Sequence, residues 1–212
     1  MTPTRAGAGR PKSREKRFAI LGSAAALFLK QGVEDTTMGD VAKEAGVSKQ
    51  TVYSHFGSKE ALYEAVIAYK LELYGLDSQL VDEHSHVPDA LRAVARQFLD
   101  LSSDPEVVAM FRILIAESAR NPETVDLFWR SGPQKTQRAL AHRLGYWASR
   151  GILSMDDPDT ETCLFFGALQ GDHHMEQLMN RTVEWDEARR DRLADLVVTR
   201  FLKAWDYNPD RE

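Results

Sequence analysis

Polar side chains gather between residues 48 and 55, and their types and spacing suit hydrogen bonding to nucleic acid. Hydroxyl groups, amides and amines of this kind bond to base edges in the major groove or to phosphate oxygens. The side chains that packing does not require in this stretch are Ser48, Lys49, Gln50, Thr51, Tyr53, Ser54 and His55. The stretch therefore indicates a DNA-binding surface.

Two short helices joined by a tight turn are expected to position this surface. Thr37 and Asp40 have the spacing of a capping box, in which a hydroxyl and a carboxylate satisfy free backbone N–H groups at a helix start. Gly46 suits a tight turn with a positive φ angle, and the small Ala42 lets the second helix cross closely over the first. Ser48 can cap the second helix. The segment predicts a helix-turn-helix whose second helix enters the major groove.

Charge is distributed unevenly along the chain. The 212 residues include 27 Lys and Arg against 32 Asp and Glu, a net charge of −5 that by itself argues against a nucleic-acid partner. Residues 1–60 carry ten basic and six acidic residues, a net of +4, whereas the remainder carries 17 and 26, a net of −9. Because the basic excess coincides with the helix-turn-helix, one end of the molecule is expected to face a polyanion.

Helical periodicity accounts for the rest of the chain. Apolar residues recur at steps of three and four, as in Phe18, Leu21, Ala25 and Phe28, and no sustained two-residue alternation typical of strands is found. The fold class predicted is all-α. Beyond the two short helices, one further helix is expected to end at Gly151. The other helices are expected to cover residues 13–32, 58–82, 88–103, 105–119, 122–130, 158–180 and 187–206.

The chain shows no sign of secretion or membrane insertion. No apolar run approaches the ~20 residues of a membrane span, and the basic start is not followed by the apolar stretch of a signal peptide. Cys163, the single cysteine, cannot form an internal disulfide and is expected to be buried on an apolar helical face. A cytoplasmic protein with no membrane partner is expected.

Two parts of the sequence resemble known families. The segments TTMGDVAKEAGVS (36–48) and TVYSHFGSKEAL (51–62) resemble the DNA-binding domain of the TetR/AcrR transcriptional regulators. Residues 110–180, from the FRILIAESARNPE segment to the Asp156-Asp157-Pro158 turn, resemble the AefR-like C-terminal domain. Residues 1–12 are rich in Gly, Ala, Pro and Arg and lack an apolar period, which predicts a disordered basic arm. The resemblance implies a three-helix DNA-binding domain over 13–60 and a helical ligand-binding and dimerisation domain over 61–212.

By position, the resemblance assigns roles in DNA binding. Phosphate and backbone contacts are implied for Thr37, Tyr53, His55 and Lys59. Base reading is implied for Lys49, Gln50 and Thr51, beside Ser48 at the start of the helix. Gly39 departs from the family's pattern, which often places an arginine or another polar side chain there. The basic arm is expected to add salt-sensitive minor-groove or non-specific contacts through Arg10, Lys12 and Arg14.

Aromatic and methionine residues are plentiful in the C-terminal part, and the resemblance implies a pocket there for a small apolar or amphipathic effector. Each such residue, taken singly, is more often ordinary core. The candidate pocket residues are Phe111, Trp129, Trp147, Phe166, Gln170 and His173. No cofactor is expected.

The resemblance also implies a homodimer, in which the helices near 158–180 and 187–206 of each copy pair across a two-fold axis. The alternative is that these apolar faces close the core of a monomer. A two-fold dimer would present two recognition helices to a palindromic operator in double-stranded DNA. Effector binding would favour a dimer whose recognition helices are wrongly spaced for the two half-sites, as in a ligand-responsive repressor.

Two other classes of function compete with this interpretation. A metal-dependent helical enzyme needs paired Glu-x-x-His motifs, and the chain has a single match, from Glu83 to His86. A helical adaptor that binds protein and not DNA would leave unexplained why the basic excess lies on the helix-turn-helix. The sequence therefore favours a transcriptional regulator over an enzyme and predicts no metal site.

Overall fold

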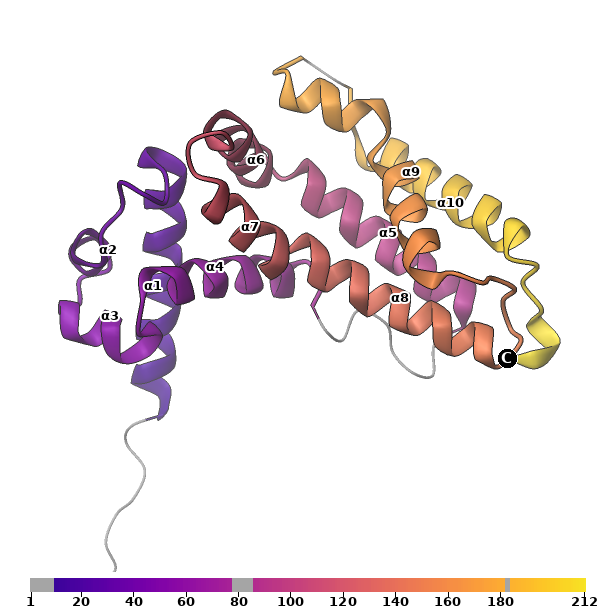
Figure 1. Cartoon of the computed structure of the whole chain (residues 1–212), viewed down its shortest axis with the longest axis horizontal. Coiled ribbons are helices and arrows are strands. Elements are labelled where there is room, and N and C mark those ends of the chain that lie inside the picture. The colour runs from indigo at the N-terminus through magenta and orange to yellow at the C-terminus, as the bar shows by residue number, and fades with distance from the viewer. Residues whose placement is uncertain (1–9, 78–85, 182–183) are drawn as a thin grey trace, which may run out of the picture. The chain divides into compact units, whose positions relative to one another are not determined.

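The computed structural model describes residues 10–77, 86–181 and 184–212 (Figure 1). These residues form ten α-helices and one short 3-10 turn, and none of them lies in a strand. The all-α prediction is confirmed. Within this described part, no helix is both long enough and apolar enough to cross a lipid bilayer.

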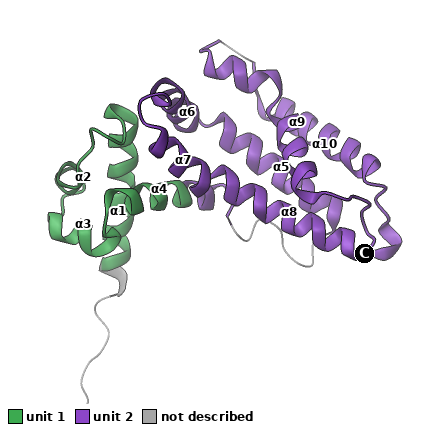
Figure 2. Ribbon diagram, viewed as in Figure 1, with its two compact units in different colours: residues 1–69 green, residues 70–212 purple. Residues whose placement is uncertain are grey.

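The chain divides into two compact units, residues 1–69 and residues 70–212 (Figure 2). Unit 1 contains α1 (Arg10–Gln31), α2 (Met38–Glu44), α3 (Lys49–Phe56) and most of α4 (Lys59–Leu73). Unit 2 contains the remaining helices, which are α5 (Val87–Ser103), α6 (Pro105–Glu117), α7 (Pro122–Ser131), α8 (Pro133–Ser149), α9 (Pro158–Leu178), α10 (Glu187–Ala204) and the 3-10 turn Pro209–Arg211.

The predicted basic arm lies largely outside the described residues. Because α1 begins at Arg10, the last three positions of the predicted arm, residues 10–12, are helical. Most of the Glu83–His86 match also lies outside the described residues. His86 itself lies 3.1 Å from a carboxylate oxygen of Glu212, measured from its Nδ1 atom.

The core of unit 1 forms where α1 packs against α2 and the start of α4. Ile20, Ala24 and Phe28 are fully buried on α1, and the Phe28 ring meets the Tyr63 ring edge-on at 5.4 Å between centroids. The sequence placed Phe18 on the buried face of this helix, but Phe18 is 39% exposed. The buried face is therefore rotated relative to the predicted one. The Phe18 ring lies against Tyr69 instead, with 5.4 Å between the ring centroids.

Prolines and aspartates start the helices of unit 2. Proline is the first residue of α6, α7, α8 and α9, where its missing N–H costs nothing and its fixed φ suits a helix. Asp104 caps α6 by accepting hydrogen bonds from the backbone N–H groups of Glu106 (2.7 Å) and Val107 (3.3 Å). Asp157 caps α9 in the same way. These local signals explain why most helix starts were predictable.

Helix α5 is the centre of unit 2, and it packs against both α9 and α10. Leu91, Val94 and Leu99 on α5 are fully buried. Burying each such side chain contributes about 1.5–3 kcal/mol. Phe98 of α5 lies against Phe166 of α9, with 4.7 Å between ring centroids.

Helix α4 is shorter than the predicted helix over 58–82, because it ends at Leu73. Gly75 adopts φ +68°, and the backbone N–H of Leu76 bonds to the carbonyl of Leu71 at 2.9 Å. This six-residue closure with a left-handed glycine is a Schellman motif, which stops a helix. Leu76 is then buried.

Helix α9 contains a break that the periodicity did not reveal. Gly171 has φ +48° and ψ −165°, a backbone conformation that is essentially restricted to glycine. The break separates the first thirteen residues of α9 from a final segment, residues 172–178, that carries His173 and His174. Cys163, on the first part, is exposed, so the prediction of a buried thiol was wrong.

Candidate nucleic-acid interface

The start of α2 is held by the predicted capping box. The backbone N–H of Asp40 donates to Thr37 Oγ1 at 3.2 Å, and the backbone N–H of Thr37 donates to Asp40 Oδ2 at 3.0 Å. The Thr37 hydroxyl also donates to that carboxylate at 2.6 Å, and these bonds lower the pKa of Asp40. A phosphate would therefore have to compete with Asp40 for the Thr37 proton.

The turn between α2 and α3 has the conformation that its glycine predicts. Gly46 has φ +65°, and the backbone N–H of Val47 bonds to the carbonyl of Ala42 at 2.9 Å. A Cβ at Gly46 would meet no atom within 4 Å, so the constraint is the φ angle and not space. Ala42 is buried where the two helices meet.

Helix α3 has a buried face and an exposed face. Val52 is fully buried and Phe56 is nearly so, and these two residues anchor the helix in unit 1. Lys49 and Gln50 are exposed, and Tyr53 is 45% exposed. Because the exposed residues are those able to bond to DNA, the helix presents a polar outer surface on an apolar support.

Two hydroxyl groups stabilise the first turn of α3. Ser48 Oγ accepts a hydrogen bond from the backbone N–H of Thr51 at 3.1 Å and lies 2.8 Å from Thr51 Oγ1. Ser54 donates to the Thr51 carbonyl at 2.8 Å. These hydroxyls have partners inside the helix, which leaves the amine of Lys49 and the amide of Gln50 as the side chains best placed to reach a base.

Basic groups lie on aromatic rings around this surface. Lys49 Nζ is 5.9 Å from the centroid of the Tyr53 ring, and Arg17 Cζ is 4.7 Å from that of Phe56. Such cation–π contacts hold the stem of a cation while its charge stays exposed. Arg17 was not among the predicted contacts, although its place after Arg14 in the basic segment was a signal for it.

Lys59 and His55 have partners within unit 1. Lys59 Nζ donates to the backbone carbonyl of Glu34 at 2.9 Å and lies 3.8 Å from its carboxylate. His55 is partly buried beside Phe56, with 6.0 Å between the ring centroids. Their DNA contacts stay predictions, as do those of the whole set Thr37, Ser48, Lys49, Gln50, Thr51, Tyr53, His55 and Lys59.

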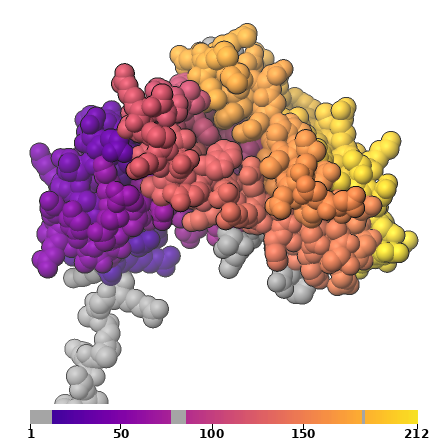
Figure 3. All heavy atoms as spheres, in the orientation of Figure 1, coloured from indigo at the N-terminus to yellow at the C-terminus, as the bar shows by residue number. Residues whose placement is uncertain are grey.

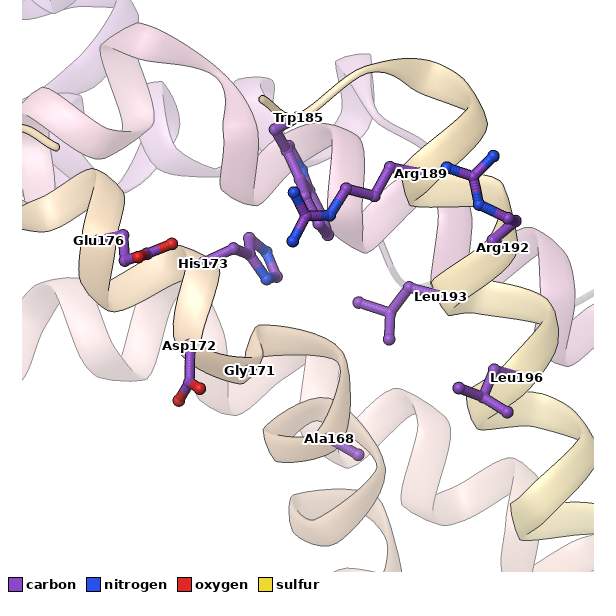
Figure 4. Close-up of a pocket in the computed structure, with 10 residues that line it drawn as sticks. All are labelled: Ala168, Gly171, Asp172, His173, Glu176, Trp185, Arg189, Arg192, Leu193 and Leu196. Carbon is purple, nitrogen blue, oxygen red and sulfur yellow. The ribbon is translucent and has the colours of Figure 1, made fainter. Parts of the chain in front are cut away.

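The predicted effector residues do not converge on one site. Trp147 and Phe166 are buried core residues, and Trp129 is 49% exposed. Phe111 is partly buried against Phe128 and His174. Gln170 is partly buried, and His173, which is buried, lines a groove between α9 and α10 (Figure 4).

Comparison with known proteins defines the class to which this fold and this polar helix belong. Residues 20–66 match the family described as bacterial regulatory proteins, tetR family, and residues 89–207 match the AefR-like transcriptional repressor C-terminal domain. The chain belongs to the TetR family of transcriptional regulators. It is a DNA-binding regulator of the repressor type and not an enzyme, as the sequence predicted.

Individual relatives agree with this assignment. The regulator TtgW of Pseudomonas putida is 31% identical over 104 residues, which cover 49% of this chain and 75% of TtgW. SrpR, also from Pseudomonas putida, is 31% identical over 104 residues, which cover 49% of this chain and 47% of SrpR.

Solved structures share the fold over nearly the whole chain. A TetR-family regulator from Mesorhizobium loti has a TM-score of 0.72 at 27% identity and covers 92% of this chain and 98% of its own. The flavonoid-responsive regulator FrrA has a TM-score of 0.70 at 33% identity, with 90% and 97% coverage.

Proposed function

We propose that this protein acts in the cytoplasm as a homodimeric repressor that binds a palindromic operator and responds to a small apolar or amphipathic effector. The exposed polar face of α3, on a basic unit of a TetR-family chain, is the observation that carries this proposal. Lys49 and Gln50 would read base edges, since a lysine recognises guanine and a glutamine recognises adenine in the major groove. Tyr53 would bond to a phosphate and fix the register of the helix.

Dimerisation is supported by an apolar outer face on α9 and α10, which adjoin on the surface of unit 2 (Figure 3). Leu164 is 55% exposed and Leu196 is 49% exposed. Gly167 and Ala168, which follow Leu164 on α9, are also exposed, and such small residues allow a partner helix to approach closely. A two-fold contact through this face would bury these leucines and pair two copies of α3.

Coupling between effector and DNA is supported by a cluster of polar groups at the end of α4. Lys70 Nζ lies 2.7 Å from an Asp104 carboxylate oxygen and 2.8 Å from one of Glu106, and the Tyr74 hydroxyl donates to Asp104 at 2.6 Å. Because Asp104 also caps α6, a shift of α6 would move Asp104 and, through its bonds to Lys70 and Tyr74, the end of α4. An effector that prefers one position of α6 would then shift the population of the dimer.

The response to a small organic molecule draws further support from FrrA, which is named as flavonoid-responsive and is 33% identical to this chain. The apolar and aromatic character of unit 2 supports an effector that is itself apolar or amphipathic.

Fluorescence anisotropy on duplex DNA tests the proposal. The protein is titrated onto a labelled palindrome from its own upstream region and onto a scrambled duplex of equal composition, at several salt concentrations. Tight binding to the palindrome that weakens steeply with salt is expected, because lysine and arginine contacts release counterions. Equal or absent binding to both duplexes would instead favour a protein-binding adaptor.

A further inference from the structure

A groove of about 340 Å³ lies between α9 and α10 beside the break at Gly171 (Figure 4). One wall is apolar and consists of Trp185, Leu193 and Leu196. Arg189 and Arg192 line it from α10, and His173 lines it from α9. The volume is at the lower end of the range for small-molecule sites, and suits a molecule of one or two rings.

Trp185 has three contacts with neighbouring side chains. Its indole N–H donates to Ser103 Oγ at 2.8 Å, and its ring is stacked on that of His173 with 3.8 Å between centroids and 13° between planes. Arg189 Cζ lies 5.3 Å from the same ring centroid. A fixed aromatic wall offers apolar contact without an entropic cost on binding.

The two arginines carry charge that the described residues do not neutralise. No ion pair of Arg192 is found in the described part of the chain, and Arg189 Nη1 donates to a neutral acceptor, the Glu184 carbonyl, at 2.8 Å. Glu176, on the opposite wall, is paired with Arg181 at 3.4 Å. The Asp172 carboxylate points away from the arginines in Figure 4. The charged residues that line the groove are two of each sign, and Arg189 is the cation that Figure 4 shows reaching toward Trp185 and His173.

His173 adds an unsatisfied polar atom to the groove. The residue is only 5% exposed, and its Nε2 has no hydrogen-bond partner among the described residues. Burial, and then the neighbouring His174 and Arg189, lower the pKa of His173 to about 4, so the ring is neutral at pH 7. Buried polar atoms normally have a partner, and a bound molecule would supply one here.

We propose that this groove binds a small amphipathic carboxylate. The carboxylate pairs with Arg189 and Arg192 and accepts a hydrogen bond from His173, and the apolar body lies along Trp185 and the two leucines. The consequence of this inference rests on the proposed function, because Ala168 and Leu196 line the groove and also belong to the face proposed to dimerise. A carboxylate bound there would act directly on the geometry of the dimer.

Calorimetry with a matched pair of probes tests the site. The full-length protein is titrated with 1-naphthoate and with its neutral analogue 1-naphthamide. We expect the carboxylate to bind at least tenfold more tightly than the amide. We also expect Arg192→Gln to remove most of that difference while leaving amide binding unchanged. Arg138→Gln removes a charge from α8 that is also exposed and should change neither affinity, and thermal melting checks that both variants fold.

Three outcomes would overturn the proposal. They are equal affinity for the two probes, an unchanged preference in Arg192→Gln, and no binding of either probe. If neither probe binds and Arg192→Gln changes the monomer–dimer equilibrium instead, the groove is filled by the second copy.

A parallel titration on operator DNA separates this inference from the proposed function. Naphthoate that binds at Arg192 without changing operator affinity would leave the site standing and contradict an effector role for it. Failure of the unliganded protein to bind its operator would contradict the proposed function and leave the calorimetric result untouched.

Discussion

Individual side chains on α3 divide into those with partners inside the helix and those that are free to bind DNA. Ser48, Thr51 and Ser54 bond to one another or to the α3 backbone, whereas Gln50 and Tyr53 are exposed. The hydroxyls therefore stabilise the helix, and Gln50 and Tyr53 are the residues available to contact DNA. We expect Tyr53 to contribute to operator affinity and Gln50 to base selectivity.

Tyr53→Ala is expected to weaken operator binding at least tenfold. A hydrogen bond to a charged phosphate contributes about 1.5–3 kcal/mol, and the exposed ring contributes little to folding. Tyr146→Ala is a matched control, since Tyr146 on α8 is 43% exposed against 45% for Tyr53. Anisotropy and thermal melting check both variants. Unchanged operator affinity in Tyr53→Ala would contradict a phosphate contact by Tyr53.

Gln50→Ala is expected to change base preference more than overall affinity. A bidentate contact between glutamine and adenine contributes about 1–3 kcal/mol of discrimination at one base pair. Binding to a panel of operators, each with one base pair replaced, measures the effect. The variant should lose discrimination at one symmetric pair of positions, and a uniform loss across the panel would contradict base reading.

Helix ends and breaks determine where the functional groups of unit 2 lie. Glu212 accepts hydrogen bonds from the Tyr207 hydroxyl (2.7 Å) and from the backbone N–H of Val87, the first residue of α5. The 3-10 turn is thereby fastened to the start of the central helix. Gly171 breaks α9 where the groove begins.

Glu212→Gln is expected to destabilise the protein by about 1 kcal/mol near pH 7, as loss of a helix cap does. Partial burial opposes ionisation, but hydrogen bonds from Tyr207, Val87 and His86 outweigh it and lower the pKa of Glu212. The carboxylate therefore contributes stability above its ordinary pKa of 4.5, and this is lost as pH falls through the lower folded value.

Urea unfolding at a series of pH values measures this effect. The difference between the wild type and Glu212→Gln should shrink in acid, whereas Glu72→Gln, on the exposed side of α4, should behave like the wild type throughout. A difference that persisted below pH 3 would show that the carboxylate charge is not what stabilises α5.

Gly171→Ala is expected to lower the free energy of unfolding by about 1–3 kcal/mol, because an alanine is strained at φ +48° and ψ −165°. Gly22→Ala in α1 is the control, since a Cβ there meets no atom within 4 Å and helical alanine is favoured over glycine. Thermal melting should therefore move in opposite directions for the two variants. A stabilised Gly171→Ala would mean that α9 is continuous in solution.

Local signals made the secondary structure and the helix-turn-helix predictable, and long-range packing limited the rest. The capping box at Thr37 and the glycine turn at Gly46 depend on neighbouring residues, so the sequence contained them in full. The face of α1 depends on α2 and α4, and this is why Phe18 was assigned to the core.

The groove at His173 was only partly predictable for the same reason. Its walls come from α9 and α10, and Trp185 precedes α10 and lies outside any helical periodicity. The backbone break at Gly171 left the apolar spacing of α9 intact. The aromatic content of the sequence therefore suggested Trp147 and Phe166 as pocket residues, whereas both side chains are buried in the core.

At the scale of the whole molecule, the two units carry opposite net charge and are proposed to have different partners. The basic unit would bind DNA, and the acidic unit would bind the effector and a second copy. Net charge over the chain averages these two parts, so it is a poor guide to function.

Leu196→Glu is expected to convert the protein to a monomer and to weaken operator binding on the order of 100-fold, because two linked half-sites bind far more tightly than one. Ile115→Glu places the same charge at a residue of α6 that is 59% exposed and should leave both properties unchanged. Sedimentation velocity and anisotropy measure the two effects. A dimeric Leu196→Glu variant would exclude this face as the interface.

Hydroxyl-radical footprinting on the protein's own upstream DNA tests most directly whether two copies of α3 read a palindrome. Two protected half-sites are expected, related by two-fold symmetry and centred about one helical turn apart or a multiple of it. Protection of a single unsymmetrical site, or no protection at concentrations where the protein is folded, would contradict a homodimeric operator-binding repressor.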